Sequence, residues 1–278
     1  MQAFFVSAAS GRRFCILHPA LGAPVGRVLY LHPLAEEMNK SRRMVALQAR
    51  ALAAAGFDVL QIDLAGCGDS SGDFDEATWP AWVDDGLLAC QWLDQRPGST
   101  QPLWLWGLRS GCLLAAAVAR QRAAPCNFLF WAPQLSGRLV LQQFLRLRVA
   151  NQMLAGDGRG VMADLKRQLA AGDTVEVAGY RLRPELALGL EQAQLTPPPG
   201  GGTAPAAVCW LDVASQPGAA FPPAALQAQQ AWSAAGARLT TGLVAGPQFW
   251  QTTEIEDAPE LVAATTAAVR APRSAGGG

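Results

Sequence analysis

The chain carries little charge. Only 16% of its 278 residues are charged, and 22 basic residues balance 22 acidic ones. A chain without net charge has no overall field that would draw it to nucleic acid or to an anionic membrane. We therefore expect no nucleic-acid partner.

Histidine is scarce and cysteine is scattered. The chain has only His18 and His32, and none of its six cysteines forms a CxxC pair. No Cys/His cluster has metal-ligand spacing, and no Gly-Lys-Ser/Thr phosphate loop occurs. The sequence thus favours free, mostly buried thiols in a reducing compartment, and it predicts neither a metal ion nor a cofactor.

Long apolar runs are also missing. No run approaches the ~18 residues that a membrane-spanning helix needs. The N-terminus lacks the basic segment followed by an apolar one that is typical of a signal peptide. We expect no transmembrane segment and a cytoplasmic location.

What the chain does contain is apolar sequence in a regular rhythm. Half of its residues are hydrophobic, which is enough for a sizeable core. An opening hairpin is expected over residues 4–7 and 14–17, and further strands over 28–31, 59–64, 103–106, 128–131, 207–213 and 238–244. Helices are expected between them, over 42–55, 81–94, 112–119, 223–235 and 259–270. This alternation predicts an α/β fold with a mostly parallel central sheet and helices on both faces.

Two local signals complete this plan. Residues 35–40 are expected to form a charged loop, with Ser41 as the N-cap of the helix after it. From residue 136 to 190 the alternation stops and a mostly helical pattern indicates a cap insertion. The expected organisation is a core over 1–135, the cap over 136–190, a Pro/Gly linker over 191–205, a second core part over 206–273 and a disordered tail over 274–278.

The stretch from Pro102 to Arg120 organises the chain. A short apolar run ends in Gly107-Leu108-Arg109-Ser110-Gly111, and a helix-forming segment of small residues follows. This layout is typical of a nucleophile elbow, in which Gly-x-nucleophile-x-Gly holds one side chain above a parallel sheet. The middle position is Arg109, and the serine stands one place late, at Ser110.

Four features in order resemble the α/β-hydrolase fold over nearly the whole chain. They are a strand ending in His32-Pro33, a glycine-rich loop over 66–72, the elbow and the cap insertion. Two short stretches resemble a narrower group: Glu36-Glu37-Met38-Asn39-Lys40-Ser41-Arg42, which follows His32, and Gly246-Pro247-Gln248-Phe249-Trp250. That group is the second type of exosortase A system-associated hydrolase, found in bacteria with exopolysaccharide and protein-sorting loci.

The resemblance implies a Ser-His-acid triad and an oxyanion loop at His32, Pro33 and Leu34. At each of the three triad positions this sequence has a residue other than the one that the family implies. Arg109 stays protonated at any working pH and cannot attack a carbonyl. Ser110 would be a nucleophile only in a shifted register that places Leu108 where the bend needs a small residue. In the natural register Ser110 supplies a backbone N–H to the oxyanion site.

The base and the acid are missing at the places that the family implies. The histidine position after the last strand falls at Gln248, and glutamine accepts no proton in catalysis. His32 is the remaining candidate base, whereas His18 suits a strand end. Asp212 lies inside a strand, two or three places before the expected acid.

What remains is a pocket with Arg109 at the tip of the elbow. Either Glu36 or Glu37 pairs with Arg109 and closes the dead site, or Arg109 and the helix N-terminus clamp a carboxylate or phosphate. Trp131 and Trp250 would flank the mouth of this pocket.

The sequence thus favours a catalytically degenerate α/β-hydrolase that binds a small acyl, carboxylate or phosphate ligand. A second alternative is an active ester or thioester hydrolase, or acyl transferase, that uses Ser110 with His32. A third is a scaffold whose cap binds a protein partner of the exosortase and exopolysaccharide locus.

Overall fold

The computed structural model describes residues 1–96, 103–154, 160–199, 206–216 and 218–270. The start of the elbow stretch at Pro102, the last part of the expected linker and the expected tail at 274–278 lie outside these residues.

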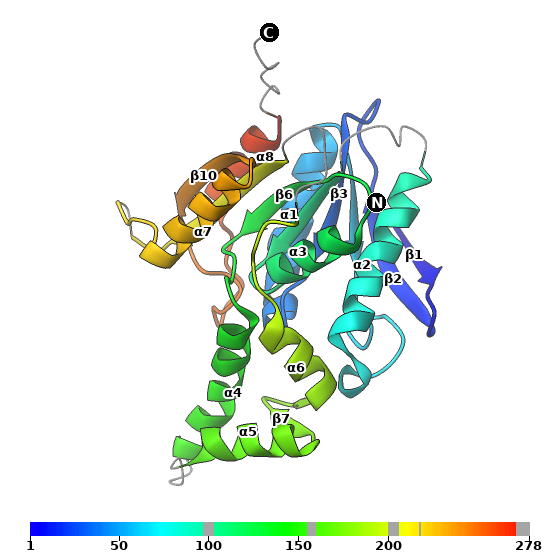
Figure 1. The fold of residues 1–278 in the computed structure, drawn as a ribbon. Helices are drawn as coiled ribbons and strands as arrows, with labels where there is room; N and C mark the ends of the chain where they lie inside the picture. The colour runs from blue at the N-terminus through cyan, green and yellow to red at the C-terminus, as the bar shows by residue number, and fades with distance from the viewer. Residues whose placement is uncertain (97–102, 155–159, 200–205, 217, 271–278) are drawn as a thin grey trace.

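An eight-stranded sheet forms the centre of the molecule, with strand order β1-β2-β4-β3-β5-β6-β9-β10 (Figure 1). Only β1 and β2 run antiparallel to their neighbours, as the expected hairpin requires. The bounds are β1 Gln2–Ser7, β2 Arg12–His18, β3 Gly26–Leu31, β4 Phe57–Ile62, β5 Leu103–Leu108, β6 Asn127–Trp131, β9 Ala207–Ala214 and β10 Arg238–Ala245. The predicted α/β-hydrolase architecture, a mostly parallel sheet flanked by helices, is confirmed.

Helices cover both faces of the sheet. Their side chains build two apolar clusters, one with α2, α3 and α7 and one with α1 and α8. The bounds are α1 Glu36–Ala54, α2 Trp79–Asp94, α3 Gly111–Gln121, α7 Pro223–Ala234 and α8 Pro259–Arg270. Strands β3, β5 and β6 are buried along their whole length, which is why most of their residues are apolar.

The helix after β3 begins earlier than the sequence indicated. The expected loop over residues 35–40 is helical from Glu36 onward, so the prediction of Ser41 as N-cap was wrong. Ala35, with φ of 51°, makes the sharp turn that starts the helix. Ser41 is fully buried inside the helix, and its hydroxyl donates to the Met38 carbonyl.

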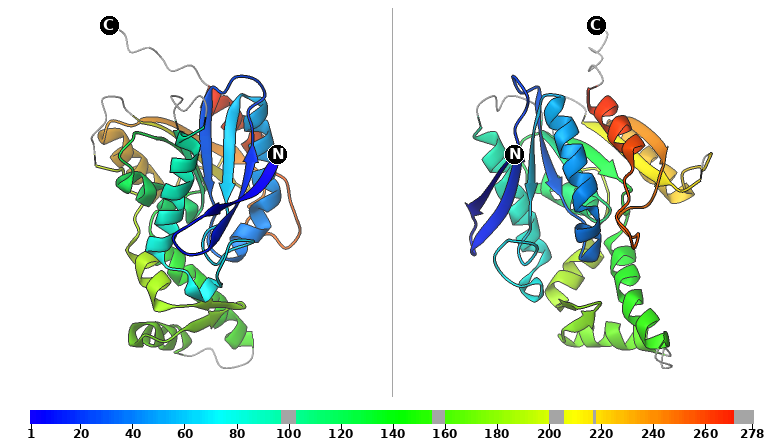
Figure 2. Two further views of the ribbon diagram at one scale, coloured as in Figure 1. Left: turned by 90° about the vertical axis from the view of Figure 1, so that its right-hand side faces the viewer. Right: turned by 180° about the vertical axis from the view of Figure 1, so that it is seen from behind.

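The cap stands below the sheet in Figure 1 and consists of α4, α5, a small hairpin and α6 (Figures 1 and 2). The bounds are α4 Gly137–Leu154, α5 Val161–Ala171, β7 Val175–Val177, β8 Tyr180–Leu182 and α6 Pro184–Gln192. Its entry and exit lie side by side, because Ser136 and Gln194 form an isolated bridge. The sequence missed the hairpin, because each strand has only three residues.

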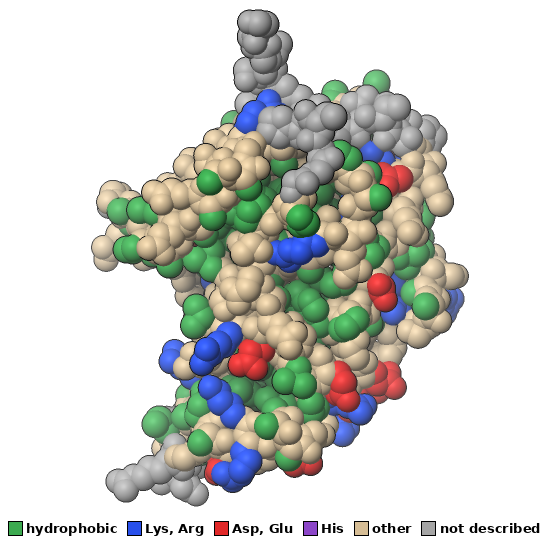
Figure 3. Space-filling model, in the orientation of Figure 1, with side chains coloured by type: hydrophobic (Ala, Val, Ile, Leu, Met, Phe, Trp, Pro, Cys, Tyr) green, Lys and Arg blue, Asp and Glu red, His purple; other side chains and the backbone are tan. Residues whose placement is uncertain are grey.

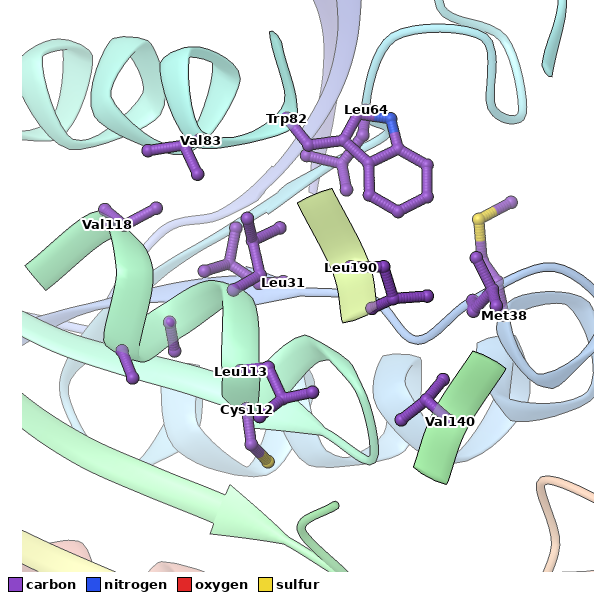
Figure 4. Close-up of a cluster of buried hydrophobic side chains, with 14 of the residues drawn as sticks. Leu31, Met38, Leu64, Trp82, Val83, Cys112, Leu113, Val118, Val140 and Leu190 are labelled. Carbon is purple, nitrogen blue, oxygen red and sulfur yellow. The ribbon is translucent and has the colours of Figure 1, made fainter. Parts of the chain in front are cut away.

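The cap packs directly on the core beside the elbow. Val140 of α4 and Leu190 of α6 join Met38, Trp82 and Leu113 in one apolar cluster (Figure 4). All five side chains are buried. The cap therefore shares its apolar core with the helices that carry the candidate site.

Candidate active site

The elbow forms where the sequence placed it. Strand β5 ends at Leu108, Arg109 turns with φ of 54°, and α3 begins at Gly111. A Cβ on Gly107 would lie 2.5 Å from the Cys112 nitrogen, and one on Gly111 would lie 2.2 Å from the Leu31 carbonyl oxygen. Both glycines are therefore required by close backbone approach.

Backbone strain is concentrated around this turn. Among the described residues, four non-glycine positions have positive φ, and Ala35, Arg109 and Ala132 are three of them. Ala132 follows β6, next to β5 in the sheet, and Ala35 precedes α1. Such conformations persist at functional sites because the surrounding fold imposes them. The turn at Arg109 thus has the strained backbone that is typical of a nucleophile elbow.

Arg109 occupies the tip of the elbow and is held by a carboxylate. Its Nε donates to Glu37 Oε1 at a distance of 3.2 Å. The Arg109 side chain is 18% exposed and the Glu37 side chain 29%. Of the two glutamates that the sequence offered as partners, the structure pairs Glu37 with Arg109.

Two further residues hold the guanidinium. The amide of Gln134 faces Nη1 and Nη2 of Arg109, so its oxygen must point that way, and it accepts from Nη1 at 3.1 Å and from Nη2. The Trp250 ring lies 5.3 Å from the Arg109 Cζ, in cation–π geometry. Sequence analysis missed Gln134, although its position just after a strand that neighbours the elbow strand was a usable signal.

Glu36 makes different contacts. Its Oε2 accepts from the Tyr180 hydroxyl at 3.0 Å and from Asn39 Nδ2 at 3.3 Å. Arg181 adds an ion pair to Asp75 over 3.1 Å. The first turn of α1 therefore holds the elbow through Glu37 and the β7–β8 hairpin of the cap through Glu36.

Ser110 is buried and its hydroxyl is occupied. The backbone N–H of Leu34, in the loop that the family resemblance assigns to the oxyanion site, donates to Ser110 Oγ over 2.9 Å. Only 5% of Ser110 is exposed. The Ser110 hydroxyl thus satisfies the Leu34 N–H.

His32 has both ring nitrogens engaged by backbone. Nδ1 lies 2.8 Å from the Pro33 carbonyl oxygen, and Nε2 accepts from the Leu64 N–H at 3.3 Å. With this tautomer Nδ1 donates and the ring is neutral. Burial lowers the pKa of His32, which favours the same neutral form. Among the described residues, no hydrogen bond joins Ser110 to either histidine.

His18 lies in β2, two strands from β3 in the sheet. Its Nε2 lies 3.2 Å from Gln61 Nε2, and burial lowers its pKa. These contacts give His18 a place in the sheet rather than at the elbow.

The loop that follows β10 brings the Trp250 indole to the elbow. Trp250 is 2% exposed and covers the guanidinium, whereas the Gln248 amide oxygen accepts from Gln251 Nε2. Trp131, which the sequence also placed at the mouth, is fully buried and donates from Nε1 to Thr265. Trp250 therefore lines the site, and Trp131 belongs to the core.

Asp212 stands near the end of β9 with a partly buried carboxyl. Its Oδ1 accepts from the Val213 N–H at 3.0 Å. Burial raises its pKa, and the Arg109 charge opposes that shift. Burial likewise raises the pKa of Glu37 despite its contact with Arg109. The positive charge of Arg109 thus favours the ionised forms of two partly buried carboxyl groups, those of Glu37 and Asp212.

A small cavity of about 20 Å³ lies beside His32, between α1 and the sheet. It is lined by Tyr30, His32, Met38, Ser41, Arg42, Val45, Gln61, Ile62 and Asp63, and not by Arg109. The described residues contain no group of three His, Cys, Asp or Glu placed to hold a metal ion. None of the helices in the described ranges is long and apolar enough to cross a membrane.

A family model described as serine aminopeptidase, S33, matches residues 22–181. The chain belongs to this α/β-hydrolase family. The match covers the oxyanion loop, the elbow and most of the cap, and it ends before β9, β10 and the late loop with Trp250.

Two curated proteins match about two fifths of the chain. The human protein ABHD12B is 33% identical over 114 residues, which are 40% of this chain and 29% of that protein. The uncharacterized protein RP471 of Rickettsia prowazekii (strain Madrid E) is 32% identical over 114 residues, 41% of this chain and 47% of that protein. In both cases the matched part is less than half the length of the relative.

Solved structures match over almost the whole chain. Est1E from Butyrivibrio proteoclasticus, with bound ferulic acid, has a TM-score of 0.67 and 14% identity, over 95% of this chain and 96% of its own. XC6422 from Xanthomonas campestris, an α/β serine hydrolase without a lid, has a TM-score of 0.58 and 16% identity, over 97% and 93%. At such identities the likeness shows the fold alone.

Proposed function

We propose that this protein is a non-catalytic α/β-hydrolase that acts by binding a ligand or a partner. The observation that carries the proposal is the occupant of the elbow: Arg109, held by Glu37, Gln134 and Trp250. A guanidinium is not a nucleophile, and its neighbours are arranged to hold it in place.

The rest of the catalytic apparatus supports the same conclusion. Hydrolysis by this fold needs a base beside the nucleophile and a free pair of N–H donors for the oxyanion. The Leu34 N–H already bonds to Ser110 Oγ, and both nitrogens of His32 face backbone groups. Loss of a single triad member costs several orders of magnitude in rate.

The ligand we propose carries a carboxylate or a phosphate. Arg109 has five N–H groups, and the contacts to Glu37 and Gln134 use three of them. An anion that met the others would compete with Glu37 for the guanidinium. If none binds, the Arg109–Glu37 pair simply closes the old site.

The biological setting rests on the sequence resemblance. We place the protein with the exosortase A-associated hydrolases of bacteria, in exopolysaccharide biosynthesis and protein sorting. A protein of that locus, bound through the cap, is the partner that this setting suggests. The cytoplasmic location stays a prediction.

A fluorophosphonate probe tests the absence of catalysis. We expect no covalent labelling of the wild type and no hydrolysis of acyl esters or thioesters. The alternative is an active hydrolase or acyl transferase that uses Ser110 with His32. Labelling that disappears in Ser110→Ala and in His32→Gln would establish it and refute the proposal.

Titration calorimetry tests the anion site. Acetate, a medium-chain fatty acid, inorganic phosphate and a sugar phosphate are titrated into the wild type, Arg109→Ala and Arg138→Ala. Arg138 is exposed on the cap, so its variant controls for general loss of positive charge. Binding that only Arg109→Ala loses supports the clamp, and equal affinity in all three proteins refutes it.

A further inference from the structure

The last strand of the sheet has an open edge. Strand β10 pairs with β9 along its whole length, from Arg238 opposite Ala207 to Ala245 opposite Ala214, and it is the terminal strand. None of its eight residues is buried, unlike those of β3, β5 and β6. An edge of this length presents a row of backbone donors and acceptors.

The direction of these groups follows from the ladder. The N–H of Arg238 donates to the Ala206 carbonyl and that of Gly246 to the Ala214 carbonyl, so even-numbered residues face β9. Alternate residues of a strand point their amides to opposite sides, so the odd-numbered residues face outward. Within the described residues, the N–H and C=O groups of Leu239, Thr241 and Leu243 have no hydrogen-bond partner on that side.

The part of the chain that forms this edge carries little charge. Between Asp212 and Glu254 the only charged residue is Arg238, and this interval includes α7, β10 and the loop to Trp250. Figure 3 shows the side of the molecule with α7 mostly in green and tan, whereas the cap carries both blue and red side chains. Depletion of charge is what distinguishes the core of a protein interface from ordinary surface.

The usual protection of edge strands is missing here. Strand β10 contains no Pro, Lys, Asp or Glu, its one charged residue is Arg238 at its start, and its register with β9 is free of bulges. The opposite edge differs, because the Arg12 guanidinium lies 4.9 Å from the Phe5 ring and brings a charge onto β1.

From these observations we infer that β10 pairs with β10 of a second copy of this chain, in antiparallel orientation. With the two-fold axis at Thr241, Leu239 of each copy lies opposite Leu243 of the other, and the two Thr241 residues face each other. Arg238 of each copy then lies opposite Val244, which keeps the two positive charges at opposite ends. Leu–Leu and Thr–Thr pairs stabilise antiparallel strands.

The choice of a second copy of this chain as the partner of β10 follows from this self-complementarity. Arg238 is the only charged residue of β10, so the edge offers little to a charged partner, while its outward amides match those of an identical strand. Such pairing continues one sheet through both copies and brings their α7 helices near each other, where Leu226 is 45% exposed. Because β10 and the elbow are separated by β9 and β6, this inference does not depend on what the elbow binds.

Sedimentation equilibrium of the full chain over a range of concentrations tests this pairing. We expect a mass of twice the chain for the wild type and of one chain for Thr241→Pro, which removes an outward N–H. Thr241→Val keeps that N–H and should remain dimeric. Circular dichroism verifies that each variant is folded.

A second variant covers the case in which proline disturbs the strand. Thr241→Lys keeps the backbone N–H and places two like charges opposite each other at the axis, so it should also be monomeric. A monomeric wild type would overturn the inference. So would a dimer that persists in folded Thr241→Pro or Thr241→Lys.

Discussion

The backbone N–H of Leu34 donates to Ser110 Oγ over 2.9 Å, so the serine of the elbow is bound by the loop after β3. This bond joins the start of α3 to the loop after β3, and Ser110 is 5% exposed. The hydroxyl acts as an acceptor that satisfies a buried donor. Its role is structural, and this has consequences that can be measured.

Ser110→Ala should therefore destabilise the protein. The substitution leaves the buried Leu34 N–H without a partner, which costs about 1–3 kcal/mol. Urea unfolding measures the change in free energy. Ser233→Ala, at an exposed serine of α7 for which no side-chain hydrogen bond is found, is the control and should be neutral. An equally stable Ser110→Ala variant would contradict this role.

Arg109→Ser, which restores serine to the tip of the elbow, should remain inactive. The new hydroxyl would have no histidine beside it, because both nitrogens of His32 face backbone groups and Trp250 covers the tip. A serine without a base is a weak nucleophile. Release of p-nitrophenol from short acyl esters provides the assay, with wild type and Ser110→Ala as references. Activity well above both would show that a base is within reach.

Glu37→Gln should change how stability depends on pH. Burial raises the pKa of Glu37 above its ordinary 4.5, although Arg109 opposes the shift. The folded state then holds its proton to higher pH than the unfolded chain. Glu37 therefore lowers the free energy of unfolding as pH rises from near 4.5 through its folded pKa.

In Glu37→Gln this loss should be absent, so its stability should fall less than that of the wild type across the same window. Chemical denaturation on both sides of pH 4.5 checks the difference. Glu260→Gln, at an exposed glutamate in the first turn of α8, should follow the wild type. Parallel curves for Glu37→Gln and wild type would refute the assignment.

Tyr180→Phe should loosen the hairpin of the cap. The Tyr180 hydroxyl donates to Glu36 and accepts from Asn39, and these bonds connect the hairpin to α1. Loss of about 1 kcal/mol corresponds to about fivefold faster amide exchange, measured over residues 175–182 by mass spectrometry.

The control for this experiment is Arg167→Ala. It removes an ion pair with Asp164 that stays within α5 and does not reach the core. Exchange of the hairpin should then match the wild type. Equal exchange in Tyr180→Phe and Arg167→Ala would show that the bond to Glu36 does not hold the hairpin.

Elements with a strong periodic signal were predictable from the sequence. Buried strands such as β5 and β6 have short apolar runs, and the helix expected over residues 81–94 is found as α2. The start of α1 was missed because residues 36–40 are mostly polar and lie ahead of a good N-cap candidate. The turn at Ala35 sets where α1 begins, and nothing in the sequence predicts that this alanine has φ of 51°.

The sequence by itself determined that the middle position of the elbow pattern is Arg109 and that the chain has only two histidines, His18 and His32. A guanidinium is not a nucleophile, and this follows from residue identity alone. Only the tertiary structure decided which groups meet at the elbow. Glu37, Gln134 and Trp250 come from three segments far apart in the chain, and the ends of parallel strands bring them together. Glu36 and Glu37 are successive residues of α1, so their side chains leave the helix in different directions. As a result the Glu37 carboxylate contacts Arg109, and the Glu36 carboxylate contacts Tyr180 of the cap.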